Sequence, residues 1–287
     1  MEYFSEKNSS KVVQSKFDKC ENPRLKKIMQ SAVHHLHAFI KDVELTQDEW
    51  AYAINYLTNI GQKCDDKRQE FILLSDVLGV SMLVDAINNR KSVNATESTV
   101  LGPFYFESPK RNLGDNINLE GKGEDSYIYG RVSDINGNPI IGAKVDVWQA
   151  NDAGFYDVQQ PDIQPDMNLR GLFQTDLAGK YWFRSVKPKH YSIPTDGPVG
   201  LMLASTGRHP YRPAHLHYIV SAEGYKSVTT HVFVKGSEYL DSDAVFGVKD
   251  SLISEYIEIN NIEKAKSLEF KNPFYELEFN FVLDKKK

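Results

Sequence analysis

Cysteine is scarce in this sequence, and its scarcity limits the kinds of fold to consider. Cys20 and Cys64 are the two cysteines among 287 residues, and they do not form a CxxC pair. Two isolated thiols cannot build the disulfide framework of a small secreted domain, nor a cysteine cluster that binds zinc. We therefore expect reduced thiols and a cytoplasmic protein.

Long apolar runs and an excess of positive charge are also missing. No run approaches the roughly 18 apolar residues of a membrane-spanning helix, and the first twenty residues lack the apolar stretch of a signal peptide. Lys and Arg number 34 against 39 Asp and Glu, which gives a net charge of −5. Such a chain has no broad cationic field, so we expect neither a membrane span nor a nucleic-acid partner.

Apolar residues with helical spacing dominate the first third of the chain. They recur every three or four residues from Leu25 to Ile40, which predicts a helix with one apolar stripe. Thr46 and Glu49 form a T-x-x-E capping box at the start of a second helix. A third helical stretch is expected at about residues 67–88. Its expected buried side consists of Phe71, Leu74, Leu78, Leu83 and Ile87.

The period falls to two after the helical part, which indicates strands. Apolar and polar residues alternate at 143–147 and again at 277–283, and Gly137 and Gly179 mark turns between such segments. Helices followed by strands predict an α+β fold in which a helical domain precedes an all-β sandwich or barrel. We expect a polar tail at 1–20, a helical domain at 21–98 and the β domain at 99–287.

Two His-x-His sequences differ in what they can do. Alternate residues of a strand point to one face, so His215 and His217 could bind one metal ion. On a helix, residues two apart lie about 200° apart around the axis, so His35 and His37 cannot readily share one. We therefore expect His34, His35 and His37 to be surface or interface residues.

The residues alone leave the metal and the function open. Two histidines suit Zn, Cu, Fe or Ni, and no HExxH motif or nearby carboxylate supplies a third ligand. A zinc hydrolase and a non-catalytic β-sandwich binding module both remain compatible with this pattern. Arg212, taken alone, is best explained as a salt-bridging surface residue.

Five segments carry a resemblance to a known family, the intradiol ring-cleaving dioxygenases. The resemblance extends over nearly the whole chain between Arg24 and Leu283. The segments are CDDKRQEFILLSDVLGVSMLVDAIN at 64–88, GPFYFE at 102–107, AKVDVWQANDAGFYD at 143–157, NLRGLFQTDLAGKYWFRSVKP at 168–188 and GRHPYRPAHLH at 207–217.

The resemblance implies one Fe(III) per subunit, held by Tyr156, Tyr191, His215 and His217. Anionic phenolate oxygens suit a trivalent ion, whose charge drives their deprotonation far below the usual pKa near 10. Tyr191 and Arg212 are implied as catalytic: Tyr191 leaves the iron and can take up a substrate proton, and Arg212 stabilises negative charge on the substrate ring. His231 either lies near the iron without binding it or is an ordinary core histidine.

The resemblance is strongest to the hydroxyquinol branch, through LLSDVLGVSMLVDAIN, TESTVLGPFYFE, YSIPTDGPVG and SEYLDSDAVFGVKDSL. It implies O₂-dependent cleavage of benzene-1,2,4-triol to 3-hydroxy-cis,cis-muconate, the enol form of maleylacetate, in aromatic degradation. Catechol or chlorocatechol is the alternative substrate. Asp76 either accepts a hydrogen bond from the third ring hydroxyl or is a helix-surface aspartate. The implied substrate-binding residues are Leu73, Asp76, Val100, Gly102, Pro103, Phe104, Ile193, Pro194, Arg212 and Val245.

The resemblance also implies partners for the two expected domains. The helices of residues 21–98 would act as a dimerisation and linker domain that pairs two subunits, with a phospholipid enclosed between them. Residues 99–287 would form the iron-binding catalytic domain. We therefore expect a homodimer whose small-molecule partners are an aromatic diol or triol and O₂.

Overall fold

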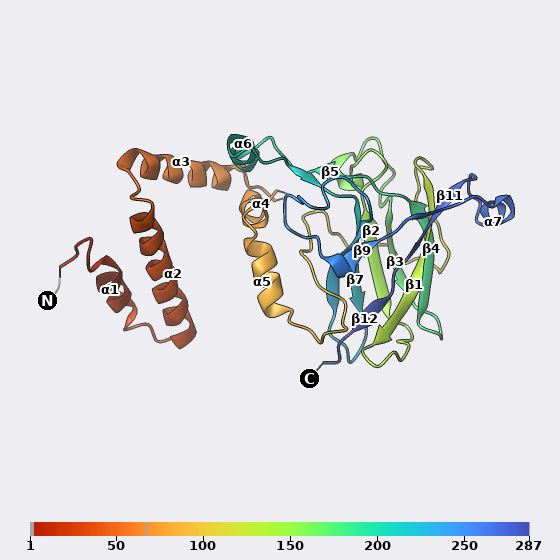
Figure 1. Ribbon diagram of the computed structural model, residues 1–287, viewed down its shortest axis with the longest axis horizontal. Helices are drawn as coiled ribbons and strands as arrows, with labels where there is room; N and C mark the ends of the chain where they lie inside the picture. The colour runs from red at the N-terminus through yellow and green to blue at the C-terminus, as the bar shows by residue number, and fades with distance from the viewer. Residues whose placement is uncertain (1–2, 67, 287) are drawn as a thin grey trace. The chain divides into compact units, whose positions relative to one another are not determined.

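The computed structural model of the chain describes residues 3–66 and 68–286 (Figure 1). Met1, Glu2, Lys67 and Lys287 lie outside the described residues, although the expected tail, third helical stretch and β domain include them. The chain divides into two compact units, Met1–Asn59 and Ile60–Lys287.

The first unit consists mainly of helices, the first of which begins at Ser9. The segment expected to be a polar tail contains a short α-helix and a 3₁₀ turn, although its apolar residues show no helical periodicity. The Gln14 side chain donates to the Gln30 carbonyl at 2.8 Å and so joins this segment to the next helix. The elements are α1 (Ser9–Gln14), η1 (Ser15–Phe17), α2 (Pro23–Asp42) and α3 (Gln47–Lys63), the last of which continues into the second unit.

Local sequence signals explain where α2 and α3 begin. The Asn22 side-chain oxygen accepts hydrogen bonds from two backbone amides, and Pro23 takes the first helical position, where it loses no helical hydrogen bond. At α3 the backbone amide of Thr46 donates to Glu49 Oε2 at 2.9 Å, and the Glu49 amide donates to Thr46 Oγ1 at 3.3 Å. The predicted capping box is confirmed.

The apolar stripe of α2 is present but uncovered within the chain. None of the residues of α2 is buried. Leu36 and Phe39, in the middle of the stripe, are 58% and 55% exposed. A single copy of the chain therefore leaves a continuous apolar helix face in contact with water.

The third predicted helical stretch is in fact two helices, α4 (Glu70–Val77) and α5 (Val80–Asn88). Gly79 separates them with φ +72°, a left-handed conformation that ends one helix and that glycine adopts without strain. The expected buried side was also wrong. Phe71, Leu78, Leu83 and Ile87 are about half exposed, and Leu74 is half-buried.

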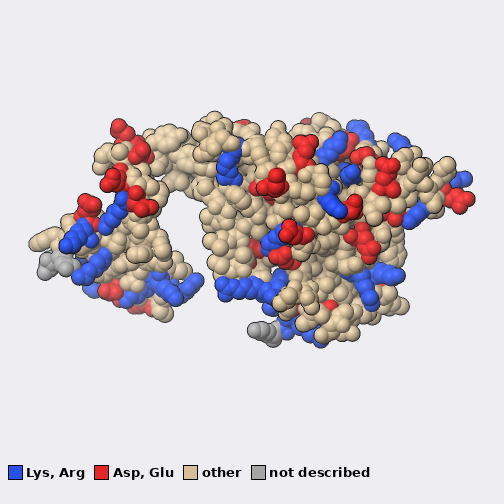
Figure 2. Space-filling view, viewed as in Figure 1, with Lys and Arg blue, Asp and Glu red and all other residues tan. Residues whose placement is uncertain are grey.

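The predicted buried side was wrong because α4 packs against the rest of its unit through a different face. Its buried residues are Glu70, Asp76 and Val77, and Arg68 neutralises the Glu70 carboxylate at 2.7 Å. Polar residues therefore occupy positions that periodicity alone assigned to solvent. In Figure 2 the surface over α4 and α5 is accordingly almost free of charged atoms.

Two five-stranded sheets form most of the second unit, which confirms the predicted α+β fold with a β-sandwich. One sheet has the order β10-β11-β1-β12 with β4 also on β1, and the other has the order β3-β2-β7-β8-β9. The strands are β1 (Asp125–Asp134), β2 (Lys144–Gln149), β3 (Arg170–Gln174), β4 (Lys180–Val186), β5 (Tyr191–Ser192), β6 (Tyr211–Arg212), β7 (His215–Ser221), β8 (Val228–Val234), β9 (Ile253–Ser254), β10 (Ile257–Ile259), β11 (Phe274–Glu278) and β12 (Phe281–Leu283). Short helices lie between them, namely η2 (Asp157–Gln159), α6 (Pro198–Ser205), η3 (Asp250–Leu252) and α7 (Ile262–Ser267).

Apolar side chains from both sheets meet in one core. Phe173 of β3 and Phe183 of β4 stack across it with ring centroids 4.9 Å apart, and both are fully buried. The predicted turns are confirmed by positive φ angles at Gly137 and Gly179, and the C-terminal alternation forms β11 and β12. Strand β7 lies between β2 and β8, so its side chains are well covered.

Charges of both signs are mixed on the face of the molecule that Figure 2 shows. Lys and Arg side chains alternate with Asp and Glu over the face seen in Figure 2. No helix within residues 3–66 or 68–286 is long and apolar enough to cross a bilayer.

Candidate metal centre

The histidines of β7 point to the same side of their strand. His215 and His217 are 2% and 1% exposed, and their Nε2 atoms are 3.1 Å apart. The pairing of β7 with β2 and β8 fixes this arrangement, because His217 lies opposite Trp148 on one side and His231 on the other. The Trp148 ring stacks on His217 at 4.8 Å and limits its rotation.

Two tyrosines from separate segments reach the same place. Tyr156 caps η2, and its Oη lies 2.8 Å from His217 Nε2. Tyr191 belongs to β5, and its ring meets the Tyr156 ring edge-on at 5.5 Å. Arg212 Nη1 donates to Tyr191 Oη at 3.4 Å. The structure thus brings together all four side chains that the resemblance implies as ligands.

The surroundings keep both imidazoles neutral, as a metal ligand must be. Burial, and then the nearby Arg212 cation, lower the pKa of His215 to about 3. Burial, His215 and Arg212 also lower the pKa of His217. His215 Nδ1 lies 2.7 Å from the Pro213 carbonyl, which can only accept a hydrogen bond. The ring proton is therefore on Nδ1, and the Nε2 lone pair faces the other donors.

The surroundings of the Tyr156 phenol oppose its ionisation unless a cation is present. Burial, and next the neighbouring Tyr191, raise the pKa of Tyr156 well above its ordinary value. A phenolate here is therefore unstable unless a positive ion compensates it. Two phenol oxygens, which become hard anionic donors when deprotonated, and two neutral imidazole nitrogens in a buried centre fit a highly charged metal ion.

A third histidine lies beside the pair. His215, His217 and His231 each have a nitrogen within 4.8 Å of the others, and all three are buried, as in a metal site. His231 Nδ1 lies 2.5 Å from Thr99 Oγ1, while its Nε2 has no hydrogen-bond partner. The His231 ring contacts the His217 ring at 4.2 Å, so it belongs to the immediate surroundings of the centre.

Arg212 forms a buried ion pair. The prediction made without the family resemblance, a salt-bridging residue at the surface, was therefore wrong about its location. Its Nε donates to Asp243 Oδ1 at 3.0 Å and its Nη2 to Asp243 Oδ2 at 3.3 Å. Both side chains are 2% exposed. Burial opposes both charges, but each partner outweighs it, so the pKa of Arg212 is raised and that of Asp243 lowered. A permanent cation therefore stands beside the donors.

Several of the expected substrate-binding residues contact this centre. Phe104 stacks on Tyr156 at 4.7 Å, and Gly102, with φ +78°, lies so close to His217 that a Cβ would stand 3.0 Å from its ring. Asp76 and Val245 are buried, and burial raises the pKa of Asp76 although a hydrogen bond from Ser81 and the charge of Arg212 oppose the rise. Ile193 is also buried, Leu73, Val100 and Pro194 are half-buried, and Pro103 is exposed.

Sequence reasoning missed three residues around the donors. Asp243 lies within SEYLDSDAVFGVKDSL without being singled out there, and Asp157 with Arg170 forms a second buried ion pair directly after Tyr156, at 2.6 Å. The only available signal was position, because Asp157 follows Tyr156 in GFYD. The helical His-x-His behaves as expected: His34 and His35 are exposed and His37 is half-buried on α2.

The chain belongs to the intradiol ring-cleavage dioxygenase family. A family profile described as Dioxygenase matches residues 100–285, and one described as Catechol dioxygenase N terminus matches residues 22–96.

Among its relatives is a hydroxyquinol 1,2-dioxygenase of Rhizobium sp. (strain MTP-10005), which is 54% identical over 98% of this chain and 96% of that relative. A catechol 1,2-dioxygenase of Candida albicans (strain SC5314 / ATCC MYA-2876) is 39% identical over 84% of this chain and 81% of that one. The solved structure of a hydroxyquinol 1,2-dioxygenase from Pseudomonas putida DLL-E4 matches with a TM-score of 0.93 at 50% identity, covering 98% of this chain and 99% of that chain.

Proposed function

We propose that this protein binds one Fe(III) per chain through Tyr156, Tyr191, His215 and His217, and cleaves hydroxyquinol with O₂ to 3-hydroxy-cis,cis-muconate. The observation that carries the proposal is the meeting of two phenols and two neutral imidazoles in one dry centre. The 54% identity to a hydroxyquinol 1,2-dioxygenase supports the substrate.

The residues present fit this metal. When bound, a ferric ion would lower the pKa of the two phenols and of the substrate hydroxyls, and would withdraw electron density so that a ring carbon reacts with O₂. All atoms of the substrate and of O₂ remain in the dicarboxylic product, so the reaction needs no external reductant.

The chain's own side chains would bind the substrate and move its protons. The Tyr191 phenolate oxygen would accept a proton from a substrate hydroxyl, and Arg212 Nη1, 3.4 Å from that oxygen, would stabilise negative charge on the ring. Phe104 would stack on the aromatic face. Asp76 would accept a hydrogen bond from the third hydroxyl, which catechol lacks. The other expected substrate-binding residues remain a prediction from the family resemblance.

We also propose that the helical residues 21–98 pair two copies of the chain and that residues 99–287 form the catalytic domain. The exposed apolar stripe of α2 supports the dimer. A phospholipid between the helices is an extension of the same proposal. Both cysteines are free, which supports the reducing cytoplasm as the compartment.

The test is O₂ uptake with product identification on iron-loaded protein. We expect kcat/KM to be highest for hydroxyquinol, lower for catechol and 4-chlorocatechol, and we expect coloured protein because tyrosinate bound to Fe(III) absorbs visible light. A preference for catechol of about tenfold or more, which is about 1.4 kcal/mol, would overturn the substrate assignment. Colourless protein that contains zinc would overturn the reaction itself.

A further inference from the structure

The guanidinium of Arg212 has two differently used sides. Nε and Nη2 donate to the Asp243 carboxylate, whereas Nη1 faces Tyr191 Oη at 3.4 Å and His215 Nε2 at 3.3 Å. Since the fork of donors is planar and rigid, fixing one side fixes the direction of the other. Asp243 therefore determines the direction of Arg212 Nη1, the nitrogen that does not contact the Asp243 carboxylate.

Asp243 is itself held in place by its own loop, which lies between β8 and η3. Its Oδ1 accepts from the Val245 amide at 3.3 Å and its Oδ2 from the Gly247 amide at 3.0 Å. The backbone at Gly247 approaches so closely that a Cβ would stand 2.9 Å from Arg212 Nη2. The loop thus encloses the carboxylate and one side of the guanidinium.

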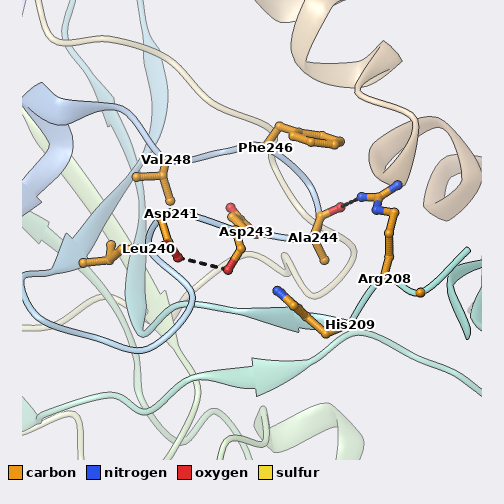
Figure 3. Close-up of a pocket in the computed structure, with 10 residues that line it drawn as sticks. Arg208, His209, Leu240, Asp241, Asp243, Ala244, Phe246 and Val248 are labelled. Atoms are coloured by element: carbon orange, nitrogen blue, oxygen red, sulfur yellow. Dashed lines mark hydrogen bonds between the residues drawn. The ribbon is translucent and has the colours of Figure 1, made fainter.

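The same loop is tied to the rest of the unit from another direction. Figure 3 shows Arg208 donating to the Ala244 carbonyl, next to Asp243, at 3.1 Å. Arg208 also donates to the carbonyl of Val77, the last residue of α4, at 2.6 Å. Arg208, Asp243 and Ala244 line a surface cavity of about 490 Å³, in which the Phe246 ring lies against Arg208. Asp243 is consequently a fixed anchor and not a mobile counter-ion.

We propose that Asp243 is a positioning residue that aims Arg212 Nη1 at the reacting substrate. The proposal rests on the proposed function, because it is the substrate anion that Nη1 would stabilise. A purely structural ion pair would need no particular direction for Nη1, whereas a positioning role requires the guanidinium to keep its present direction. If Asp243 only neutralised the charge of Arg212, losing it would change the stability of the protein. If Asp243 positions Arg212, losing it would change the turnover number.

The experiment compares iron-loaded full-length protein with Asp243→Asn and Gly247→Ala. Asn keeps the shape but loses the charge and one acceptor, while the added methyl of Gly247→Ala would stand 2.9 Å from Arg212 Nη2 and 3.1 Å from Asp243 Oδ2, and so shifts the ion pair while leaving every charge in place. For both variants we expect kcat on hydroxyquinol to fall about tenfold to a hundredfold, with KM changed less than about threefold and iron content unchanged. Asp241→Asn, on the exposed part of the same loop, is the matched control and should keep wild-type kinetics.

Crystal structures supply a readout without turnover. In Asp243→Asn we expect Arg212 Nη1 to lie beyond hydrogen-bond distance of Tyr191 Oη. Wild-type kcat in Gly247→Ala, or an unchanged Arg212 orientation in Asp243→Asn, would overturn the proposal even if one variant folds poorly. If wild-type protein takes up no O₂ with any catechol, the proposed function fails, and the orientation of Arg212 still tests the positioning.

Discussion

The two His-x-His sequences lie in regions that use the same three-residue pattern differently. On α2, His35 is exposed and His37 half-buried, on a helix that has no buried residue. On β7, His215 and His217 are buried with their Nε2 atoms 3.1 Å apart. The difference teaches that the spacing acquires chemical meaning only from the period of its element and from neighbouring strands that exclude water.

The largest expected effect tests this comparison directly. Replacing His217 with Ala should reduce bound iron from about one per chain to less than about a tenth, because one of four donors is lost. Turnover should fall at least about a thousandfold, since metal catalysis contributes several kcal/mol. Metal analysis and O₂ uptake provide the measurements. The double variant His35→Ala, His37→Ala is the control and should keep its iron; loss of iron there instead would reverse our assignment.

A second prediction concerns what the helical region does in place of metal binding. Leu36→Glu puts a charge into the exposed stripe of α2 and should weaken a dimer by about a hundredfold, because an unpaired charge would be buried at the interface. Light scattering at micromolar concentration should then report half the wild-type mass. Lys27→Glu, on the polar side of α2, should leave the mass unchanged. A wild-type protein that is already monomeric would contradict the proposed dimer.

These two regions show which helices and strands could be predicted from the sequence alone. A spacing of three to four residues located α2, and a spacing of two located β2 and the C-terminal strands, because each pattern reflects a local rule. Gly79 was overlooked as the break between α4 and α5. The exposed stripes of α4 and α5 were misjudged, since a periodic apolar face does not reveal whether its own chain or another covers it.

The candidate site was less accessible to such rules. Its donors come from β5, β7 and the start of η2, and no spacing relates Tyr156 or Tyr191 to the histidines, so only the family resemblance pointed to them. Asp243 was missed for a related reason. The role that we propose for it depends on a contact between positions 31 residues apart in sequence, which forms only when the loop folds over Arg212.

A third and smaller effect concerns selectivity in the buried region. Asp76→Asn should lower the ratio of kcat/KM for hydroxyquinol over that for catechol by about tenfold, because a hydrogen bond to a charged acceptor is weakened. Steady-state kinetics with both substrates measure the ratio. The exposed Asp66→Asn should leave it unaltered. Equal losses for both substrates would instead make Asp76 a structural residue.

The smallest effect is expected from an exposed ion pair. Hydrogen bonds from Arg68 and Lys63 lower the pKa of Asp196 to about 2. The ionised form is thus favoured in the folded protein, so its stabilisation is fully present above the unfolded pKa of about 3.9 and is lost as the pH falls toward 2. Asp196→Asn should cost less than about 1 kcal/mol at pH 7, because the carboxylate is solvent-exposed. Urea unfolding at pH 7 and pH 3 checks this; a difference between variant and wild type that grows at pH 3 would contradict it.

The ribbon of β5 and β6 has a consequence of its own. It consists of two residue pairs, and one of them joins Tyr191 to Arg212. Tyr191, the proposed proton acceptor, and Arg212, a permanent cation, therefore face each other as one residue pair of this very short ribbon. Any shift of this ribbon would move both groups together, so a change in the position of the proposed base would also move the cation beside it.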